Sequence, residues 1–365
     1  MYRMHVSKPV ISFIVPSRGA GVYLEHTINN LLDTSDSRYE VVLCLNNGSQ
    51  HVPKSILNLF DSRLRVFRTT KNLSMSSNWY QGLLNAKGEW VCYVGSDDGI
   101  VSKNLSKFID LLIKQPNISV VTNHTLAFAY PRSKNNSWAS LPIAKCTDKQ
   151  IRVNWPIKMA SFFPQFNYDL PQPYSKAIVR KFILQKIIEN ETEIPASAPD
   201  VFLGNYIAML SKNGIFIDVP LTIRGSSEVS NGIQNGSGDP RTLTSKEWLH
   251  EFHRREGYLL AKFGPTCRPA LARDSYLSAK AYRSGTQRKK HLYISEFWCN
   301  LSCRDKSHHK NIWNYFSLVT LLVYYLGLSL RKLWYVKNFG AKIPKDKRIT
   351  IYSKTSVFDI SKFFD

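Results

Sequence analysis

The first hundred residues alternate short apolar runs with amphipathic segments. The runs Val10–Val15, Tyr39–Leu45 and Trp90–Val94 contain few polar residues, which is typical of strands buried on both faces of a sheet. A helical pattern covers about residues 22–32, and Leu64–Arg68 predicts a further short strand. Strands and helices in alternation, joined by short polar turns, predict an α/β fold with a single, mostly parallel central sheet flanked by helices.

Polar turns follow the predicted strands. Pro16, Ser17 and Arg18 come after the first strand, Asn46 comes after the second, and Lys71 opens the segment after the short strand. Ligands of parallel α/β sheets bind at the carboxyl ends of the strands. We therefore expect these turns to face one common crevice.

Two adjacent carboxylates, Asp97 and Asp98, follow the strand Trp90–Val94. Ionised carboxylates are costly to bury alone, so this pair needs solvent, hydrogen-bond donors or a cation. At the carboxyl end of a strand the pair is placed to hold a divalent cation against a phosphate. A helix N-cap at Ser96 or Asp97, opening a helix predicted over Ser102–Gln115, explains the local sequence equally well.

Four motifs occur in the order VISFIVPSRG, EVVLCLNNGS, KNLSMSSNWYQGLLNAKGEW and YVGSDDG. In this order and spacing they resemble the family 2 glycosyltransferases over roughly residues 9–130. The resemblance implies a GT-A fold and an inverting enzyme that uses a nucleotide-sugar donor, by default a UDP-sugar, together with Mn²⁺ or Mg²⁺. It further implies transfer of the sugar to a hydroxyl of a glycan or of a lipid-linked saccharide.

The resemblance also assigns roles to individual residues. Asp98 is expected to ligate the metal that bridges the two donor phosphates, and Asp97 is expected to contact the ribose. The nucleotide pocket is expected to take residues from the turns and from the helix behind them, namely Pro16, Ser17, Arg18, Asn46, Lys71, Asn72 and Asn78.

Two positions depart from the family pattern. Gly95 stands where the family's metal motif often has its first Asp, and Asn46 stands where the family usually has an Asp that reads the base. An amide both donates and accepts hydrogen bonds, whereas a carboxylate only accepts them. These departures keep open a second interpretation, a non-catalytic basic binding module that retains the GT-A fold.

Inversion needs a base that takes the proton of the acceptor hydroxyl. Asp200 lies at the start of a helix predicted within Ala196–Leu210, where family 2 enzymes commonly place such a base. A structural alternative is an acidic side chain that the helix dipole favours at a helix N-terminus. Asp169 is the reserve candidate for the base.

The composition divides the chain into three parts. Residues 1–130 are expected to form the nucleotide-sugar-binding half of a GT-A domain, and residues 131–240 its acceptor-side half. Residues 224–239, rich in Gly, Ser and Asn, predict a loop that is either a lid over the donor or a surface linker. Residues 241–365 predict a basic, mainly helical C-terminal region.

The positive charge is concentrated towards the C-terminus. The whole chain carries +22, and residues 241–365 hold 24 Lys and Arg against 9 Asp and Glu. Anionic lipid and nucleic acid both suit such a surface, but the absence of a recognisable nucleic-acid-binding motif makes nucleic acid the weaker choice. Residues 312–330 carry no charge, and their pattern fits a membrane span, an interfacial helix or a packed helix of a soluble protein.

Six scattered cysteines, two of them in predicted core strands, favour reduced thiols and a cytoplasmic location. The basic C-terminal region adds the expectation of peripheral contact at the inner face of the membrane. Residues 1–9 lack an apolar core, so we expect no secretory segment there. Asn-x-Ser/Thr triplets begin at Asn47 and Asn72, and a glycan attached there would block the proposed donor pocket. These triplets therefore also argue against a location in the secretory pathway. Two cysteines and two histidines between residues 299 and 309 have a spacing that fits no common zinc site.

Overall fold

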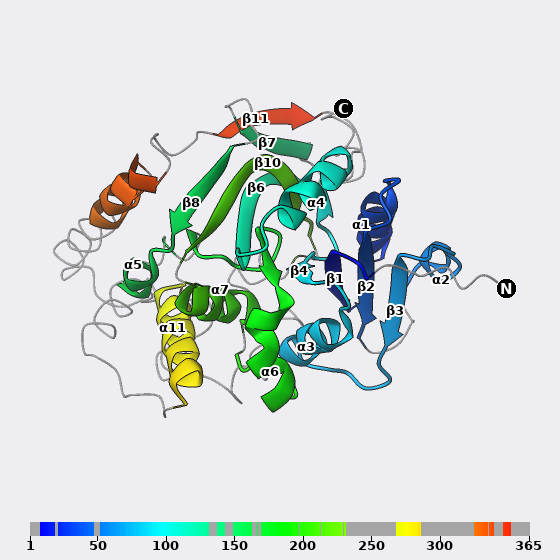
Figure 1. Cartoon of the computed structure of the whole chain (residues 1–365). Coiled ribbons are helices and arrows are strands. Elements are labelled where there is room, and N and C mark those ends of the chain that lie inside the picture. The colour runs from blue at the N-terminus through cyan, green and yellow to red at the C-terminus, as the bar shows by residue number, and fades with distance from the viewer. Residues whose placement is uncertain are drawn as a thin grey trace, which may run out of the picture.

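One mixed sheet organises the fold, and helices cover both of its faces (Figure 1). The computed structural model describes residues 8–18, 21–46, 52–130, 137–142, 149–162, 166, 169–196, 198–211, 213–228, 230, 268–285, 325–334, 336–338 and 346–351. The expected α/β fold with a central sheet flanked by helices is therefore confirmed.

The N-terminal part of the sheet is parallel and has the strand order β4, β1, β2, β3. These strands are β4 (Trp90–Tyr93), β1 (Ile11–Ser17), β2 (Tyr39–Leu45) and β3 (Leu64–Arg68). Strand β1 extends past the predicted end because Pro16 and Ser17 stay in register with β2. The carboxyl ends of all four strands lie at one edge of the sheet, as predicted.

Later parts of the chain widen this sheet, mostly with antiparallel pairs. Among these strands β10 is central, since it runs parallel to β6 and antiparallel to β5 and β8. The added strands are β5 (Gly99–Ile100), β6 (Val120–Ala129), β7 (Ser137–Pro142), β8 (Gln150–Asn154), β9 (Ala177–Arg180), β10 (Asn213–Ser226) and β11 (Asp346–Ile351). The two longest ladders, β6–β10 and β1–β2, are both parallel.

Helices pack on the two faces of the sheet. They are α1 (Val22–Leu32), α2 (Lys54–Leu57), α3 (Met75–Asn85), α4 (Leu105–Ile113), α5 (Ile157–Phe162), α6 (Gln185–Asn190), α7 (Pro199–Ser211) and α11 (Arg268–Ser284). Apolar residues of α1 and α4 share one core cluster, and those of α3, α6 and α7 share the other.

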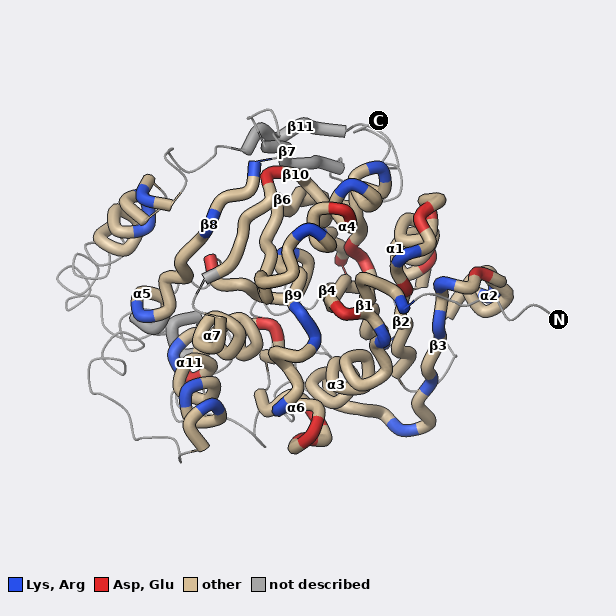
Figure 2. The backbone as a smooth tube through the Cα atoms, in the orientation of Figure 1, with Lys and Arg blue, Asp and Glu red and all other residues tan. Residues whose placement is uncertain are grey.

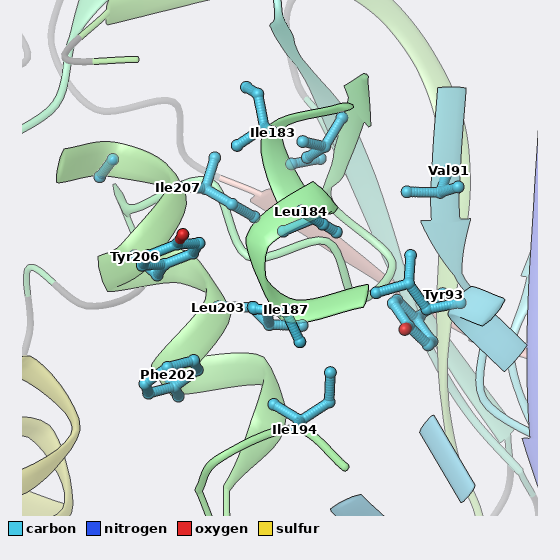
Figure 3. Packing of buried hydrophobic residues seen from close by; sticks show 14 of the residues in the cluster. Val91, Tyr93, Ile183, Leu184, Ile187, Ile194, Phe202, Leu203, Tyr206 and Ile207 are labelled. Carbon is cyan, nitrogen blue, oxygen red and sulfur yellow. The ribbon is translucent and has the colours of Figure 1, made fainter. Parts of the chain in front are cut away.

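The apolar runs are nearly continuous because each strand contributes side chains to both core clusters. Along β1, Phe13 and Val15 belong to the cluster of α1 and α4, whereas Ile14 belongs to the opposite one. On β4, Val91 and Tyr93 face α6 and α7 in the second cluster (Figure 3). Burial on both faces removes the polar alternation that a half-exposed strand shows.

The predicted loop over residues 224–239 starts later than expected. Residues 224–226 belong to β10, where they pair with residues 127–129 of β6, because the edge of β6 continues to supply backbone partners. Residues 231–239 lie outside the described residues. The prediction of a lid or a linker therefore stays a prediction.

The proposed division of the chain at residues 130 and 240 also stays a prediction. Pairing of β10 with β6 joins the first two parts in one sheet, and β11 of the basic region pairs with β7. In the described part of the chain, no helix has the length and apolar character needed to cross a bilayer. Residues 312–324 and the Cys and His residues at 299–309 lie outside it.

Candidate active site

Asp98 is fully buried, and hydrogen-bond donors satisfy both of its carboxylate oxygens. Oδ2 accepts hydrogen bonds from Gly95 N at 2.9 Å and from Ser175 Oγ at 2.6 Å, while Oδ1 accepts one from Gly225 N at 2.8 Å. The hydroxyl of Tyr174 donates to the same carboxylate. Burial and the neighbouring carboxylate raise the pKa of Asp98 to about 6, although the serine and glycine donors oppose the shift.

Asp97 is held by the segment that follows β10. Its Oδ2 accepts hydrogen bonds from Ser227 N at 3.2 Å, from Ser227 Oγ at 2.7 Å and from Ser230 Oγ. Asp97 is 7% exposed. Among the described residues, no hydrogen-bond donor contacts its Oδ1. Within the described chain, this oxygen is the position of the aspartate pair that remains available to a ligand.

Two glycines allow the close approach of backbone and side chains around the pair. A Cβ added at Gly225 would lie 1.6 Å from the carbonyl oxygen of Asp97. A Cβ added at Gly95 would lie 2.5 Å from the hydroxyl of Tyr174 and 2.9 Å from Oδ2 of Asp98. The missing first acidic residue of the motif therefore has a physical reason, since the tyrosine hydroxyl fills the space that its side chain would need.

A short strand, not a helix, follows the aspartate pair. Strand β5 pairs with β10, and α4 begins at Leu105 after a 3₁₀ turn over Ser102–Asn104. The alternative explanation of Ser96 or Asp97 as a helix N-cap is therefore wrong.

Buried polar side chains fix the backbone on either side of the pair. The hydroxyl of Thr27 donates to the carbonyl of Asp98 at 2.7 Å, and the amide of Asn30 binds both backbone groups of Ile100 at 3.0 and 2.6 Å. Ser175 has a φ of 46°, a conformation that costs a non-glycine residue about 1–3 kcal/mol. Two threonine hydroxyls at 2.7 Å from its carbonyl oxygen help to hold it there.

Asn46 joins the end of β2 to the segment before α3. Its Nδ2 donates to the carbonyl of Leu73 and its Oδ1 accepts from Leu73 N, both at 2.7 Å. A carboxylate cannot donate, so only an amide satisfies both backbone groups of Leu73. This pairing explains the departure from Asp at this position, while a contact of Asn46 with a base stays a prediction.

The other residues expected near the nucleotide lie along the same edge. Pro16 and Ser17 end β1, and Nη2 of Arg18 donates to Oδ1 of Asn72 at 2.9 Å. This hydrogen bond connects the end of β1 with the segment before α3. Lys71, in that segment, is exposed. Their roles towards a nucleotide stay predictions.

Asn78 lies on α3 and is buried against β2. Its Nδ2 donates to the carbonyl of Cys44 at 3.4 Å, while its Oδ1 has no hydrogen-bond partner. The residue thus lies on the helix behind the edge of the sheet, and a role of Asn78 towards a nucleotide stays a prediction.

Asp200 occupies the first turn of α7, as predicted. Burial raises the pKa of Asp200 above its usual range. The positive charge of Arg224 acts on both Asp200 and Asp98. The structure therefore brings the expected base and the expected metal ligand within electrostatic reach of one guanidinium group.

Asp169, the reserve candidate, forms a bidentate ion pair with Arg331. Nε of Arg331 lies 2.6 Å from Oδ2 and Nη2 lies 2.8 Å from Oδ1. A carboxylate bound on both oxygens by a guanidinium group loses that interaction when it accepts a proton. This geometry favours Asp200 over Asp169 as the base.

The aspartate pair fits a divalent cation that takes few ligands from the protein. In the described part of the chain, no three His, Cys, Asp or Glu side chains gather as a metal site. A cation at Asp98 has to replace present hydrogen-bond donors, whereas Oδ1 of Asp97 is available. Mg²⁺ uses one or two carboxylates and completes its shell with phosphate and water oxygens. Ligation by Asp98 stays a prediction.

Comparison with known proteins identifies a family over the N-terminal part of the chain. Residues 12–169 match the family model described as "Glycosyl transferase family 2". The chain carries a family 2 glycosyltransferase domain. The matched residues of this family 2 domain begin within β1, include β2 to β4 and the aspartate pair, and end at Asp169.

Two curated relatives resemble the family 2 domain. One is the "Putative teichuronic acid biosynthesis glycosyltransferase TuaG" of Bacillus subtilis, 25% identical over 122 residues that make up 33% of this chain and 48% of the relative. The other is an uncharacterized glycosyltransferase of Haemophilus influenzae, 29% identical over 126 residues, 34% of this chain and 49% of the relative. The chain spans about half the length of the curated relatives it matches.

Solved structures show a weaker likeness. Residues 1–349 of S. aureus TarS with UDP-GlcNAc give a TM-score of 0.41 at 16% identity, covering 76% of this chain and 93% of that one. A mannosyltransferase of Pyrobaculum calidifontis with GDP-Man and Mn²⁺ gives a TM-score of 0.42 at 13% identity, covering 90% of this chain and 88% of that one. At these TM-scores the likeness places no ligand in this chain.

Several residues of the site escaped prediction. Tyr174 and Ser175 lie in the turn before β9, and Gly225 and Ser227 lie at the end of β10. Richness in Gly and Ser after residue 224 was a signal for close backbone approach, but it did not identify the aspartates as the partners. All four residues belong to the part of the chain beyond the family match.

Proposed function

We propose that the chain is an inverting glycosyltransferase that moves a sugar from a nucleotide-sugar, by default a UDP-sugar, to a hydroxyl of a glycan or a lipid-linked saccharide. The observation that carries the proposal is the buried pair Asp97 and Asp98 at the carboxyl edge of the parallel strands, where the positive charge of Arg224 acts on both Asp98 and Asp200. The family 2 domain over residues 12–169 supports it independently.

The residues divide the chemistry between donor and acceptor. Departure of a nucleoside diphosphate develops negative charge, which a divalent cation stabilises when it is bound. Asp98 and its donors fix the backbone of the pair, so Asp97 directs its available oxygen towards the donor. Asp200 takes the proton of the acceptor hydroxyl, a role that typically contributes roughly 10²- to 10⁴-fold in rate.

The name of the Bacillus subtilis relative, a teichuronic acid biosynthesis glycosyltransferase, supports an acceptor that belongs to a cell-envelope polymer. In this proposal the enzyme works in the cytoplasm, at the inner face of the membrane. There nucleotide-sugars and growing saccharides meet.

Donor hydrolysis tests the proposed activity. We expect release of a nucleoside diphosphate from at least one member of a panel of UDP- and GDP-sugars. Release should increase with Mn²⁺ and disappear in the Asp98→Ala variant. Tight donor binding without release, for every donor and acceptor tried, would instead support the non-catalytic binding module.

An exposed helical face supports contact with a membrane. Residues 325–334 and 336–338 are helical, and they belong to the orange segment of Figure 1. One face presents apolar side chains that are 49–65% exposed: Tyr325, Leu326, Leu333 and Val336. Lys332 and Lys337 are exposed beside them. Apolar residues flanked by lysines are the pattern of a helix that lies in the surface of an anionic bilayer.

The opposite face of this helix is attached to the domain. Leu330 and Trp334 pack against the core cluster of α3, α6 and α7, and Nε1 of Trp334 donates to the carbonyl of Asn154 at 3.0 Å. Arg331 holds Asp169 from the same face. A bilayer bound to the exposed face would therefore lie next to the acceptor-side half of the site.

A double variant tests this contact. Leu326→Asp with Leu333→Asp should weaken binding to vesicles of anionic lipid by on the order of 10²-fold, since two large apolar side chains leave the bilayer. Flotation with vesicles measures the effect. Phe182→Asp is the matched control because Phe182 is 62% exposed outside this helix. Equal loss in the control, or no loss in the double variant, would contradict the proposed contact.

A further inference from the structure

Two cations, Lys176 and Arg224, belong to the segments that hold the aspartate pair. Lys176 follows Ser175, which binds Oδ2 of Asp98, and Arg224 precedes Gly225, which binds Oδ1. In the described part of the chain neither cation forms an ion pair, and Nε of Arg224 is buried without a hydrogen-bond partner. Each of the two residues that hold the carboxylate is thus followed or preceded in sequence by a cation, and the charge of Arg224 acts on Asp98 itself.

The strand geometry directs Arg224 towards the turn of residues 174–176, and the charge of Arg224 acts on Lys176. On β10, Arg224 shares a face with Thr222, whose hydroxyl donates to the carbonyl of Ser175 at 2.7 Å. The guanidinium carbon of Arg224 lies 5.9 Å from the centre of the ring of Tyr174. The side chains of Thr222 and Arg224 therefore both lie next to the turn of residues 174–176.

The charges of this region repel one another. Burial, together with the positive charges of Arg224 and Arg331, lowers the pKa of Lys176 to about 8, although the negative charge of Asp169 opposes the shift. Asp169 is already paired with Arg331, so its charge is largely neutralised. An anion between Lys176 and Arg224 would remove this repulsion and satisfy the buried Nε.

We propose that Lys176 and Arg224 form a phosphate-binding site that receives the diphosphate of the nucleotide-sugar donor. This inference rests on the proposed function and extends it to two residues outside the family match. It also provides a compensation for the acidic residue that is missing at Gly95. Where the acidic motif offers a cation few protein ligands, two fixed positive side chains supply part of the charge that balances the leaving diphosphate.

Calorimetric titration at pH 7 in EDTA tests the site on the full chain. We expect inorganic pyrophosphate and UDP to bind the wild type. Lys176→Gln and Arg224→Gln should each weaken UDP binding by about tenfold or more, and the double variant further. The affinity for uridine, which has no phosphate, should stay unchanged. Arg224→Lys should retain most of the affinity because it keeps the charge.

Lys114→Gln, which removes an exposed lysine at the end of α4, is the matched control and should change nothing. Circular dichroism verifies that each variant is folded. Unchanged binding of pyrophosphate and UDP in the double variant would overturn the phosphate site.

Competition separates a donor phosphate from an acceptor phosphate. Saturating UDP should displace pyrophosphate from the wild type if the site receives the donor. Pyrophosphate that stays bound beside UDP, and is lost only in the double variant, would assign the site to a phosphate of the acceptor and overturn the donor assignment. A wild type that binds pyrophosphate but no nucleoside diphosphate would overturn the proposed function and leave the phosphate site itself in place.

Discussion

Replacing Asp200 with asparagine should lower kcat by about 10²-fold or more while the affinity for the donor stays near that of the wild type. The amide keeps the shape of the side chain but cannot take the acceptor proton. In the wild type, kcat should fall as the pH drops through the raised pKa of Asp200, since protonation removes the base. Steady-state kinetics over a range of pH should show this acidic limb, and Asp200→Asn should lack it.

Two further variants sharpen this test. Asp110→Asn, at an exposed carboxylate on α4 paired with Arg38, should leave kcat unchanged. Asp169→Asn should lower stability through the loss of its pair with Arg331, and it should retain the acidic limb of the profile. Loss of that limb in Asp169→Asn alone would make Asp169 the base, and equal loss of turnover and donor affinity in Asp200→Asn would indicate a structural role.

Gly225→Ala should lower the free energy of unfolding by about 4 kcal/mol or more and abolish turnover. Its Cβ would lie 1.6 Å from the carbonyl oxygen of Asp97, a backbone atom that cannot turn away as a side chain does. Relief of the overlap would separate β10 from the aspartate pair and break the hydrogen bond between Gly225 N and Asp98. Urea unfolding followed by circular dichroism measures the loss.

Gly285 provides a matched control for this substitution. It has a φ of +67°, and a Cβ added there would meet nothing within 4 Å. Gly285→Ala should therefore cost only about 1 kcal/mol of conformational strain. Similar destabilisation by the two alanines would show that close approach to Asp97 is not what Gly225 provides.

Elements fixed by local pattern were predictable from the sequence. Helix α1 and strands β2 and β3 have the predicted bounds because an apolar run or a helical period ends there in polar turn residues. Strand β10 was harder, since Pro220 and two register shifts interrupt its pattern and its partner β6 lies far away in the chain. Residues 224–226 therefore resembled a loop although they continue the strand.

The candidate site shows the same division. Asp97 and Asp98 are adjacent, and the strand before them predicted their place at the edge of the sheet. Their hydrogen-bond partners were not predictable, because Ser175 lies 77 residues from Asp98 and Gly225 lies 127 residues from it. No local pattern encodes a partner at that separation. Only the strand order shows that β4, β9 and β10 bring these segments together.

The long separation between Asp98 and Gly225 has a consequence for the biosynthesis of the protein. At roughly 5–20 residues per second, a ribosome needs about 6–25 s to add the residues between them. During this interval the nascent chain carries both aspartates without the strand that will enclose them, so water has to solvate their charges. The site is therefore assembled late, because the carboxylates of Asp97 and Asp98 can be buried only after β10 has been synthesised.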